Sequence, residues 1–406
     1  MSTGSPAQAP TGGPGGRAPR AGLRPMHPRD RREPHRAASP LELFFDLVFV
    51  VAVSSAAVEL HHDLGAGHVT HGLVAYATVF FAVWWAWMNF TWFASAFDTD
   101  DWLYRVLTLV QMAGVLVVAA GVHDAFAAGD LTVVTAGYVV MRLALVLQWL
   151  RASRADASLR ATTHRYAVGI AVVQVAWLAR LALPGQGGTL TFVVLALAEL
   201  AVPVWAERAR PTPWHPHHVA ERYGLFALIL LGESLLASAN ALIDALRESE
   251  HLGELLVFAG CALVLAAGLW WVYFAGQHHQ RLGSRRAGLV YGYVHYVVFA
   301  AAGAFSAGIE VLLDHETGHG GLGAVASAAT VTVPVALFLL ATWGLVLRHD
   351  LDRTGDVLVV LFGLLAGAAA FAPQPLVVAA VAVTAAVVTV ERAAAARSAA
   401  TGPARA

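Results

Sequence analysis

The chain has 406 residues, of which 58% are apolar and only 13% are charged, and its 26 basic residues nearly balance its 27 acidic ones. Soluble domains carry about 25% charged residues, so this composition excludes an ordinary soluble protein and predicts one that crosses a membrane several times. The near-zero net charge disfavours nucleic-acid binding, and the single cysteine, Cys261, excludes a disulfide framework and a thiolate metal cluster.

The first segment, residues 1–38, is rich in Pro, Gly, Ala and Arg and has too few apolar side chains for a core. We therefore predict a disordered tail. The pair Arg31 and Arg32 is typical of one class of export signal, but the next apolar run contains Glu42 and Asp46 and has no small-residue cleavage site after it. We expect the tail to remain in the cytoplasm, and we expect the same of a short C-terminal tail at 393–406.

Between the tails lie apolar segments long enough, at about 1.5 Å per residue, to cross a hydrocarbon layer about 30 Å thick. We place twelve of them, at residues 42–60, 70–93, 102–122, 131–150, 166–183, 189–206, 222–242, 252–275, 287–313, 322–347, 356–372 and 375–391. They predict an all-α, polytopic membrane helix bundle of about 12 transmembrane helices. The first six-helix half would occupy residues 39–206 and the second residues 207–392.

The distribution of arginine predicts the orientation. Every basic residue is an arginine, and 22 of the 26 fall in the two tails, with the adjoining Arg392, or in alternate loops. Those loops are residues 151–165, 207–222, 276–286 and 348–355. The opposite loops contain one arginine, Arg247. Because arginine accumulates on the cytoplasmic side, we expect a multi-pass membrane protein with both termini in the cytoplasm.

The two halves share a partial sequence repeat. Adding 187 to the number of Asp46 gives Glu233, and adding 186 to Trp84 and Trp85 gives Trp270 and Trp271. The first three helices of each half would then correspond, each triplet opening with an intramembrane acid. Because six helices separate the copies, we predict a parallel 6+6 pseudo-repeat about an axis along the membrane normal. The last three helices of each half show no convincing match.

Charged residues within the apolar segments are the main functional candidates, because each costs at least about 2.5–3.5 kcal/mol at the centre of a membrane helix. Glu42 and Asp46 lie one turn apart on the first predicted helix. Arg142 lies about eight residues, or about 12 Å, from the cytoplasmic end of its helix, near the depth of Asp46. We expect an ion pair between Arg142 and Asp46, with Glu233 or Glu199 as the alternative acceptor.

Two interpretations of these charges remain open. They could serve only to fix helix packing, or Asp46 and Glu233 could line a proton or cation site at the interface between the halves, with Arg142 as counter-charge. The polar residues near Glu233 favour a cavity, although small residues also serve plain helix contact. The candidate ion- or solute-binding residues are Asp46, Glu233, Glu42, Arg142, Glu199, Asn89, Ser234 and Asn240.

An aromatic cluster at the end of the second helix has two interpretations as well. Its tryptophans, Trp84, Trp85, Trp87 and Trp92, are typical of an interfacial aromatic belt. A cation-attracting vestibule is the alternative, because Asp98, Asp100 and Asp101 follow. We expect Asn89 to hydrogen-bond across helices and the aspartates to form an ion-pair group with Arg105.

Several histidine groups resemble metal motifs, at 215–218, 61–62 and 278–279. None has cysteine support, and a proline interrupts the first, so we expect solvated loop histidines and neither a metal nor a cofactor. The chain also has no nucleotide-binding loop, nucleophile elbow or zinc-protease signature. We therefore do not expect an enzyme.

Three long motifs carry a resemblance to a known family. They are PLELFFDLVFVVAV at 40–53, WWAWMNFTWFASAFDTDD at 84–101 and AERYGLFALILLGESLLA at 220–237. Together they closely resemble the bacterial low temperature requirement A family, and the similarity covers nearly everything after the tail. The motif residues carried over are Glu42, Phe44, Phe45, Asp46, Trp85, Asn89, Trp92, Asp98, Asp100, Asp101, Glu221, Arg222, Gly224, Gly232, Glu233 and Ser234.

The resemblance implies a multi-pass protein of the bacterial inner membrane but no substrate. We expect a transporter or channel for a proton, a cation or a small solute that uses intramembrane carboxylates. The alternative is a non-transporting membrane protein that supports envelope or lipid homeostasis and growth in the cold. The expected partners are the lipid bilayer and a proton or small cation, with a homo-oligomer as a further candidate assembly.

Overall fold

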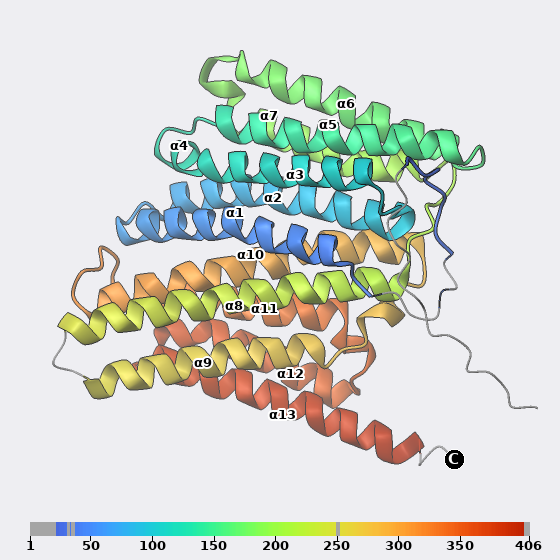
Figure 1. Cartoon of the computed structure of the whole chain (residues 1–406). Helices are drawn as coiled ribbons and strands as arrows, with labels where there is room; N and C mark the ends of the chain where they lie inside the picture. The colour runs from blue at the N-terminus through green and yellow to red at the C-terminus, as the bar shows by residue number, and fades with distance from the viewer. Residues whose placement is uncertain (1–21, 31–32, 34–36, 249–251, 402–406) are drawn as a thin grey trace, which may run out of the picture.

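The computed structural model describes residues 22–30, 33, 37–248 and 252–401, and the regular elements in these ranges are all helical (Figure 1). The long helices of the first half are α1 (Pro40–Gly65), α2 (Val69–Phe97), α3 (Trp102–Ala120), α5 (Thr132–Ala155), α6 (Arg160–Leu181) and α7 (Gly188–Ala206), and α4 (Val122–Ala127) is a short extension of α3. Those of the second half are α8 (Pro216–Glu248), α9 (Leu252–Phe274), α10 (Arg285–Glu316), α11 (Ala324–Leu345), α12 (Arg353–Ala368) and α13 (Pro375–Thr401).

The predicted fold class, an all-α polytopic membrane bundle, is confirmed. Each predicted apolar segment coincides with one long helix, although α8 extends six residues beyond its predicted segment at each end and α13 ten residues beyond its predicted end. Within the described residues, ten helices are long and apolar enough to cross a membrane, and α6 and α8 are the long helices outside this group. The exact number of crossings therefore stays a prediction.

The first half and the second half pack in the same order. Helix α1 contacts α2 and α3, as α8 contacts α9 and α10, and each half then continues through neighbouring helices to α7 or α13. In Figure 1 the remaining helices of the first half lie above α1 and those of the second half lie below it. This arrangement is compatible with the 6+6 repeat, which stays a prediction. Helices α1, α8 and α10 contact one another where the halves meet, and we call this junction the seam.

The start of α1 is fixed by a capping box. The Ser39 hydroxyl accepts a hydrogen bond from the Glu42 backbone N–H at 3.3 Å, and the Glu42 carboxylate accepts one from the Ser39 N–H at 2.8 Å. Pro40 at the first helical position is already restricted to the helical φ angle. These local interactions hold Glu42 at the end of the bundle, one turn before Asp46.

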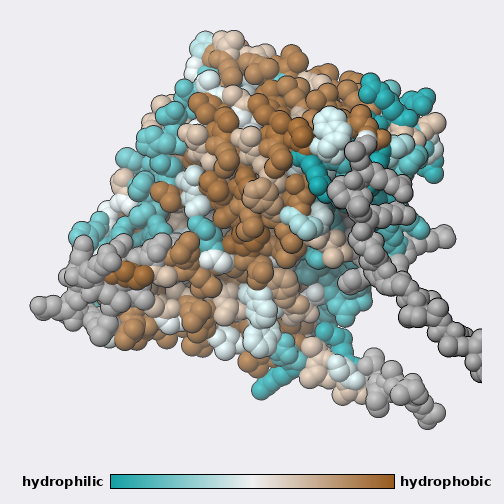
Figure 2. Space-filling view, in the orientation of Figure 1, coloured by the Kyte–Doolittle hydropathy of each residue, from teal (hydrophilic) through white to brown (hydrophobic). Residues whose placement is uncertain are grey.

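The surface follows the division expected for a membrane protein. Apolar side chains cover the middle of the visible face, and hydrophilic ones gather toward the helix ends (Figure 2). Large apolar residues are exposed on α6, α7 and α13, for example Val175 at 67% and Leu190 at 76%. Such exposure is unfavourable in water and favourable in lipid.

Part of the predicted N-terminal tail lies against the bundle. The Arg29 backbone N–H donates to the Ala96 carbonyl at 2.9 Å, the Arg29 guanidinium pairs with Asp98 at 3.3 Å, and Met26 is fully buried. Residues 22–30 therefore pack at the ends of α2 and α3. We call this end of the bundle, which also holds the end of α13, the arginine-rich end. Residues 1–21 lie outside the described part of the chain.

Candidate functional site

Asp46 is held by an arginine from the other half of the chain. Arg222 of α8 donates through Nε to one carboxylate oxygen at 2.9 Å and through Nη2 to the other at 2.5 Å. The Trp87 indole N–H of α2 donates to the same carboxylate at 2.7 Å. All three side chains are completely buried. This two-pronged, charge-assisted pairing ties α1 and α2 to α8.

Glu42 adds a second carboxylate to the same arginine. One of its oxygens lies 3.1 Å from Arg222 Nη1 and 3.1 Å from His218 Nε2. Two residues one turn apart on α1 thus face two residues one turn apart on α8. The group contains two carboxyl groups, one guanidinium and a histidine that is charged only when protonated, so with both carboxyl groups ionised its net charge is −1 or 0. We call Glu42, Asp46, Trp87, His218 and Arg222 the Asp46 cluster.

The expected ion pair between Arg142 and Asp46 is wrong, and the alternative acceptor Glu199 is the one that Arg142 contacts. Arg142 Nη2 donates to Glu199 at 2.9 Å. The estimate of depth was sound, but α5 packs against α3 and α6, and Arg142 is directed toward α7. Depth along a helix does not determine the side on which a residue lies.

Glu199 of α7 collects donors from three other helices. Arg142 and Trp85 donate to one carboxylate oxygen at 2.9 and 3.0 Å, and Tyr138 and Gln174 donate to the other at 2.9 and 2.8 Å. Each of these side chains is at most 4% exposed. These five residues, the Glu199 cluster, connect α2, α5, α6 and α7 within the first half.

Glu233 lies nearer the middle of the seam in a different environment. It is only partly buried, and it accepts a hydrogen bond from the Ser54 hydroxyl of α1 at 2.5 Å. Within the described residues, no arginine or histidine is paired with it. The neighbouring Ser234 is buried and donates to carbonyls of Leu230 and, on α10, Ala302, at 3.2 Å each. Glu233 is therefore a carboxylate inside the bundle with a hydroxyl partner.

The two asparagine candidates do not join this group. Asn89 is buried and donates to the Trp85 carbonyl of its own helix at 2.8 Å, so the predicted hydrogen bond across helices is wrong. The side chain of Asn240 lies outside the described part of the structure.

A third polar group lies at the opposite end of the seam. His61 of α1 is 3.1 Å from Glu310 and 2.7 Å from Asp314, which are one turn apart on α10. Asp46, Ser54 and His61 are separated by eight and seven residues, which is about 12 and 10 Å along α1. Polar contacts with α8 or α10 thus occur at three levels of the seam.

The tryptophans of α2 do not form an interfacial belt. Trp84, Trp85 and Trp87 are at most 2% exposed, and the last two donate to Glu199 and Asp46. Trp92 donates to the hydroxyl of Tyr223 at 2.9 Å. The indole N–H groups of Trp85, Trp87 and Trp92 thus satisfy acceptors inside the bundle.

The expected group of Arg105 with the aspartates after α2 forms only in part, because Asp98 pairs with Arg29 and Asp101 with Arg151. Asp100 pairs with Arg105 at 2.8 Å. Asp101 caps α3 by accepting from the Tyr104 N–H at 3.0 Å, and it pairs with Arg151. Burial opposes ionisation of Asp101, but the hydrogen bond from Arg151 and two backbone N–H groups lower its pKa to about 2. This group fastens the arginine-rich end rather than forming a vestibule.

The prediction of solvated histidines is wrong for His215, His218 and His278, which are at most 8% exposed. His278 follows α9, outside the membrane-spanning helices. Its Nε2 lies 2.7 Å from the Tyr273 carbonyl, which can only accept, so Nε2 carries the proton and Nδ1 accepts from the Tyr291 hydroxyl at 2.9 Å. Burial lowers the pKa of His278 to about 4 despite the carbonyl contact.

A sequence model of the bacterial low temperature requirement A protein (LtrA) matches residues 37–391, a range that contains both clusters and the whole seam. The chain belongs to the LtrA family. It is also 28% identical over 256 residues to an uncharacterized protein of Rhizobium meliloti, and the match covers 61% of this chain and 60% of that relative. The resemblance seen in the three sequence motifs is thus confirmed for this LtrA chain.

Sequence reasoning included Arg222 among the motif residues but missed its role. The segment before it contains Trp214, His215 and Pro216 and was interpreted as a loop, so Arg222 was counted with the loop arginines. Helix α8 begins at Pro216, six residues earlier than predicted, which brings His218 and Arg222 inside the bundle. A proline at the first helical position and the matching one-turn spacings were the available signals.

Proposed function

We propose that this LtrA-family protein conducts or transports a proton or small cation along the seam, rather than catalysing a reaction. The observation that supports the proposal is that an acidic side chain takes part in a polar contact between α1 and α8 or α10 at three levels of the seam. Ionisable groups in a membrane bundle normally face a partner or a wet cavity, and they often mark an ion or proton route.

Glu233 is the proposed titrating or ion-binding group. It is partly exposed, and its partner is a hydroxyl. A hydroxyl can donate to an ionised carboxylate, accept from a protonated one, or supply an oxygen to a hard cation. The Glu233–Ser54 pair is therefore suited to exchanging a proton or a cation without leaving a buried charge unsatisfied.

The Asp46 cluster is the proposed control point at the arginine-rich end. Arg222 holds Asp46 with two hydrogen bonds. It also forms an ion pair with Glu42, and His218 contacts the same Glu42 oxygen. Protonation of His218 changes the net charge next to the route. The steps of about 12 and 10 Å along α1 are longer than a hydrogen bond of about 3 Å, so water or helix movement must complete the route.

The alternative, a non-transporting protein that supports the envelope, is favoured by the Glu199 cluster. There an arginine, an indole, a phenol and an amide fully satisfy one carboxylate. Such a network fixes helix packing without any need for an ion route. If the Asp46 cluster serves the same purpose, the protein needs no flux.

Reconstitution into liposomes tests the proposal. We expect purified protein to carry protons or small monovalent cations faster than empty vesicles, as measured with pH- and cation-sensitive dyes under an imposed potential. Glu233→Gln should reduce this flux to the level of empty vesicles. Glu221→Gln is the matched control, since Glu221 lies on the same helix but is exposed, and it should retain the flux. Absence of flux for the wild-type protein across several cations and pH gradients would contradict transport.

A further inference from the structure

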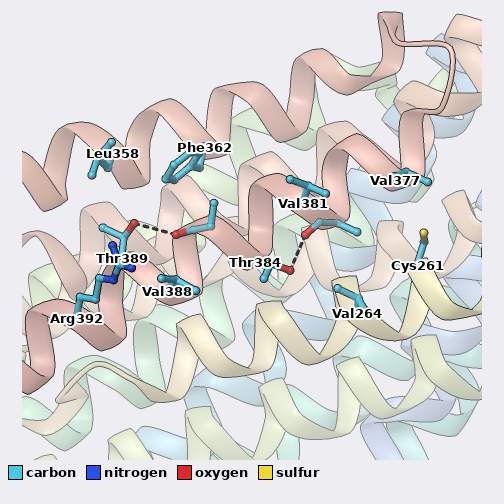
Figure 3. Close-up of a pocket in the computed structure, with 12 residues that line it drawn as sticks. Cys261, Val264, Leu358, Phe362, Val377, Val381, Thr384, Val388, Thr389 and Arg392 are labelled. Carbon is cyan, nitrogen blue, oxygen red and sulfur yellow. Dashed lines mark hydrogen bonds between the residues drawn. The ribbon is translucent and has the colours of Figure 1, made fainter.

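A groove on the outer face of the second half lies away from the seam. It has a volume of about 580 Å³ and runs between α9, α12 and α13. In Figure 3, Arg392 lies at one end and Cys261 and Val377 lie at the other, with Phe362, Val381 and Val388 between them. The groove thus has a charged end and a long apolar floor.

The polar atoms in the groove wall are already satisfied. The Thr384 and Thr389 hydroxyls donate to the Ala380 and Ala385 carbonyls of their own helix at 2.8 Å each (Figure 3). Threonine commonly makes this bond inside a helix, and it leaves the methyl group facing outward. The wall therefore offers hydrocarbon contact and favours an apolar occupant.

The length of the groove fits a lipid tail. Val377 and Arg392 are fifteen residues apart on α13, which is about 22 Å along the helix. One leaflet contributes about 15 Å of hydrocarbon, half of a layer about 30 Å thick. An acyl chain that starts at the level of Arg392 can therefore remain in the groove over its whole length.

The level of Arg392 matches that of lipid headgroups. Its neighbour Glu391 accepts a hydrogen bond from the Trp271 indole at 2.7 Å, and Trp270 and Trp271 are 42% and 45% exposed. Exposed tryptophans are typical of the membrane–water interface. Because Glu391 is occupied by Trp271 and Arg392 is exposed, the guanidinium is positioned to meet a phosphate.

We propose that this groove binds an anionic phospholipid from the leaflet at the arginine-rich end. One acyl chain lies between α9, α12 and α13, and the headgroup phosphate binds Arg392. The site is independent of the proposed transport, since it involves none of the seam residues. Lipid bound there would hold α13 against α9 and α12 at the edge of the bundle.

Native mass spectrometry of the full chain with phosphatidylglycerol or phosphatidylcholine of the same acyl chains tests the proposal. We expect the wild-type protein to retain phosphatidylglycerol at least 5-fold better than phosphatidylcholine, and Arg392→Gln to remove that preference. Arg286→Gln, a change of an exposed arginine on α10, is the matched control and should keep it. Equal retention of both lipids by the wild-type protein, or equal effects of the two substitutions, would overturn the proposal.

A substitution that fills the groove gives a second readout. Ala385→Phe, which fills the groove, should reduce retention of phosphatidylglycerol, whereas Leu361→Phe on the exposed face of α12 should not. Unchanged retention in a folded Ala385→Phe variant would contradict this location for the lipid.

Discussion

The Asp46 cluster and the Glu199 cluster use the same chemistry in two different places. Each has a completely buried arginine paired with a carboxylate, and each carboxylate accepts an indole N–H from α2. The Glu199 cluster connects helices within the first half, whereas the Asp46 cluster connects α1 with α8 of the second half. One therefore stabilises a half, and the other controls how the halves meet.

The two clusters also differ in how their charge can change. The Glu199 cluster contains one acid, Glu199, and one base, Arg142. Each Glu199 oxygen accepts two hydrogen bonds, so a proton that binds to Glu199 displaces one of the donors. The Asp46 cluster has two acids and one arginine, with His218 able to take up a proton. A fixed charge pattern suits packing, whereas a variable one suits a route for ions.

Arg222→Met should have the largest effect on stability. It leaves two buried carboxylates without their guanidinium, and loss of one partner of a buried pair costs about 3–5 kcal/mol. We expect loss of folded yield in size-exclusion chromatography. Adding Asp46→Asn to this variant should recover part of the yield, because it removes one of the uncompensated charges. Normal yield of the single variant would contradict the buried pairing.

Arg142→Met should destabilise the protein less, by about 3 kcal/mol, because Glu199 keeps three neutral donors. Thermal unfolding in detergent measures the effect, and Glu199→Gln should restore part of the stability in the Arg142→Met background. An effect larger than that of Arg222→Met would reverse the proposed difference between the clusters.

The pH dependence of stability has a contribution from His278, which lies outside both clusters. His278 has a pKa of about 4 in the folded protein and about 6.5 when unfolded, so the unfolded state binds the proton first as the pH falls. Stability is therefore complete above pH 6.5 and decreases below it, by roughly 2 kcal/mol between pH 7.5 and 5. His278→Gln should flatten this part of the profile of unfolding temperature against pH. An unchanged profile would contradict a neutral, buried His278.

Trp87→Phe and Trp85→Phe should have the smallest effects, about 1–2 kcal/mol each, because each removes one hydrogen bond to a buried carboxylate and retains most of the aromatic contact. These two variants compare the Asp46 cluster with the Glu199 cluster directly. Their losses of stability should be similar, whereas their losses of flux should differ. We expect Trp87→Phe to alter the flux per folded molecule and Trp85→Phe to leave it unchanged. Equal changes in flux would remove the functional distinction.

Much of the fold could be predicted because hydropathy is a local property. The twelve apolar segments coincide with the long helices, and the intramembrane acids were identified from their positions alone. Helix ends were less certain. The start of α8 was placed six residues late because histidine and proline interrupt the apolar pattern, although the helix begins at this proline and includes the two histidines after it.

The partners of the buried charges could not be predicted from the same information. Arg142 lies at a suitable depth for Asp46, but the contact requires knowledge of which helices are neighbours and how each is rotated. The buried tryptophans were misassigned for the same reason, since an indole in an apolar helix suits an interface as well as a buried acceptor.

The most direct test of the account compares proton flux through Glu233→Gln and Glu199→Gln proteins in the same liposomes, at equal amounts of folded protein. Both substitutions remove one carboxylate from the bundle and keep its shape. We predict that Glu233→Gln abolishes flux and that Glu199→Gln retains it while lowering the unfolding temperature. Retained flux in Glu233→Gln, with loss in Glu199→Gln, would contradict the assignment of the route to the seam.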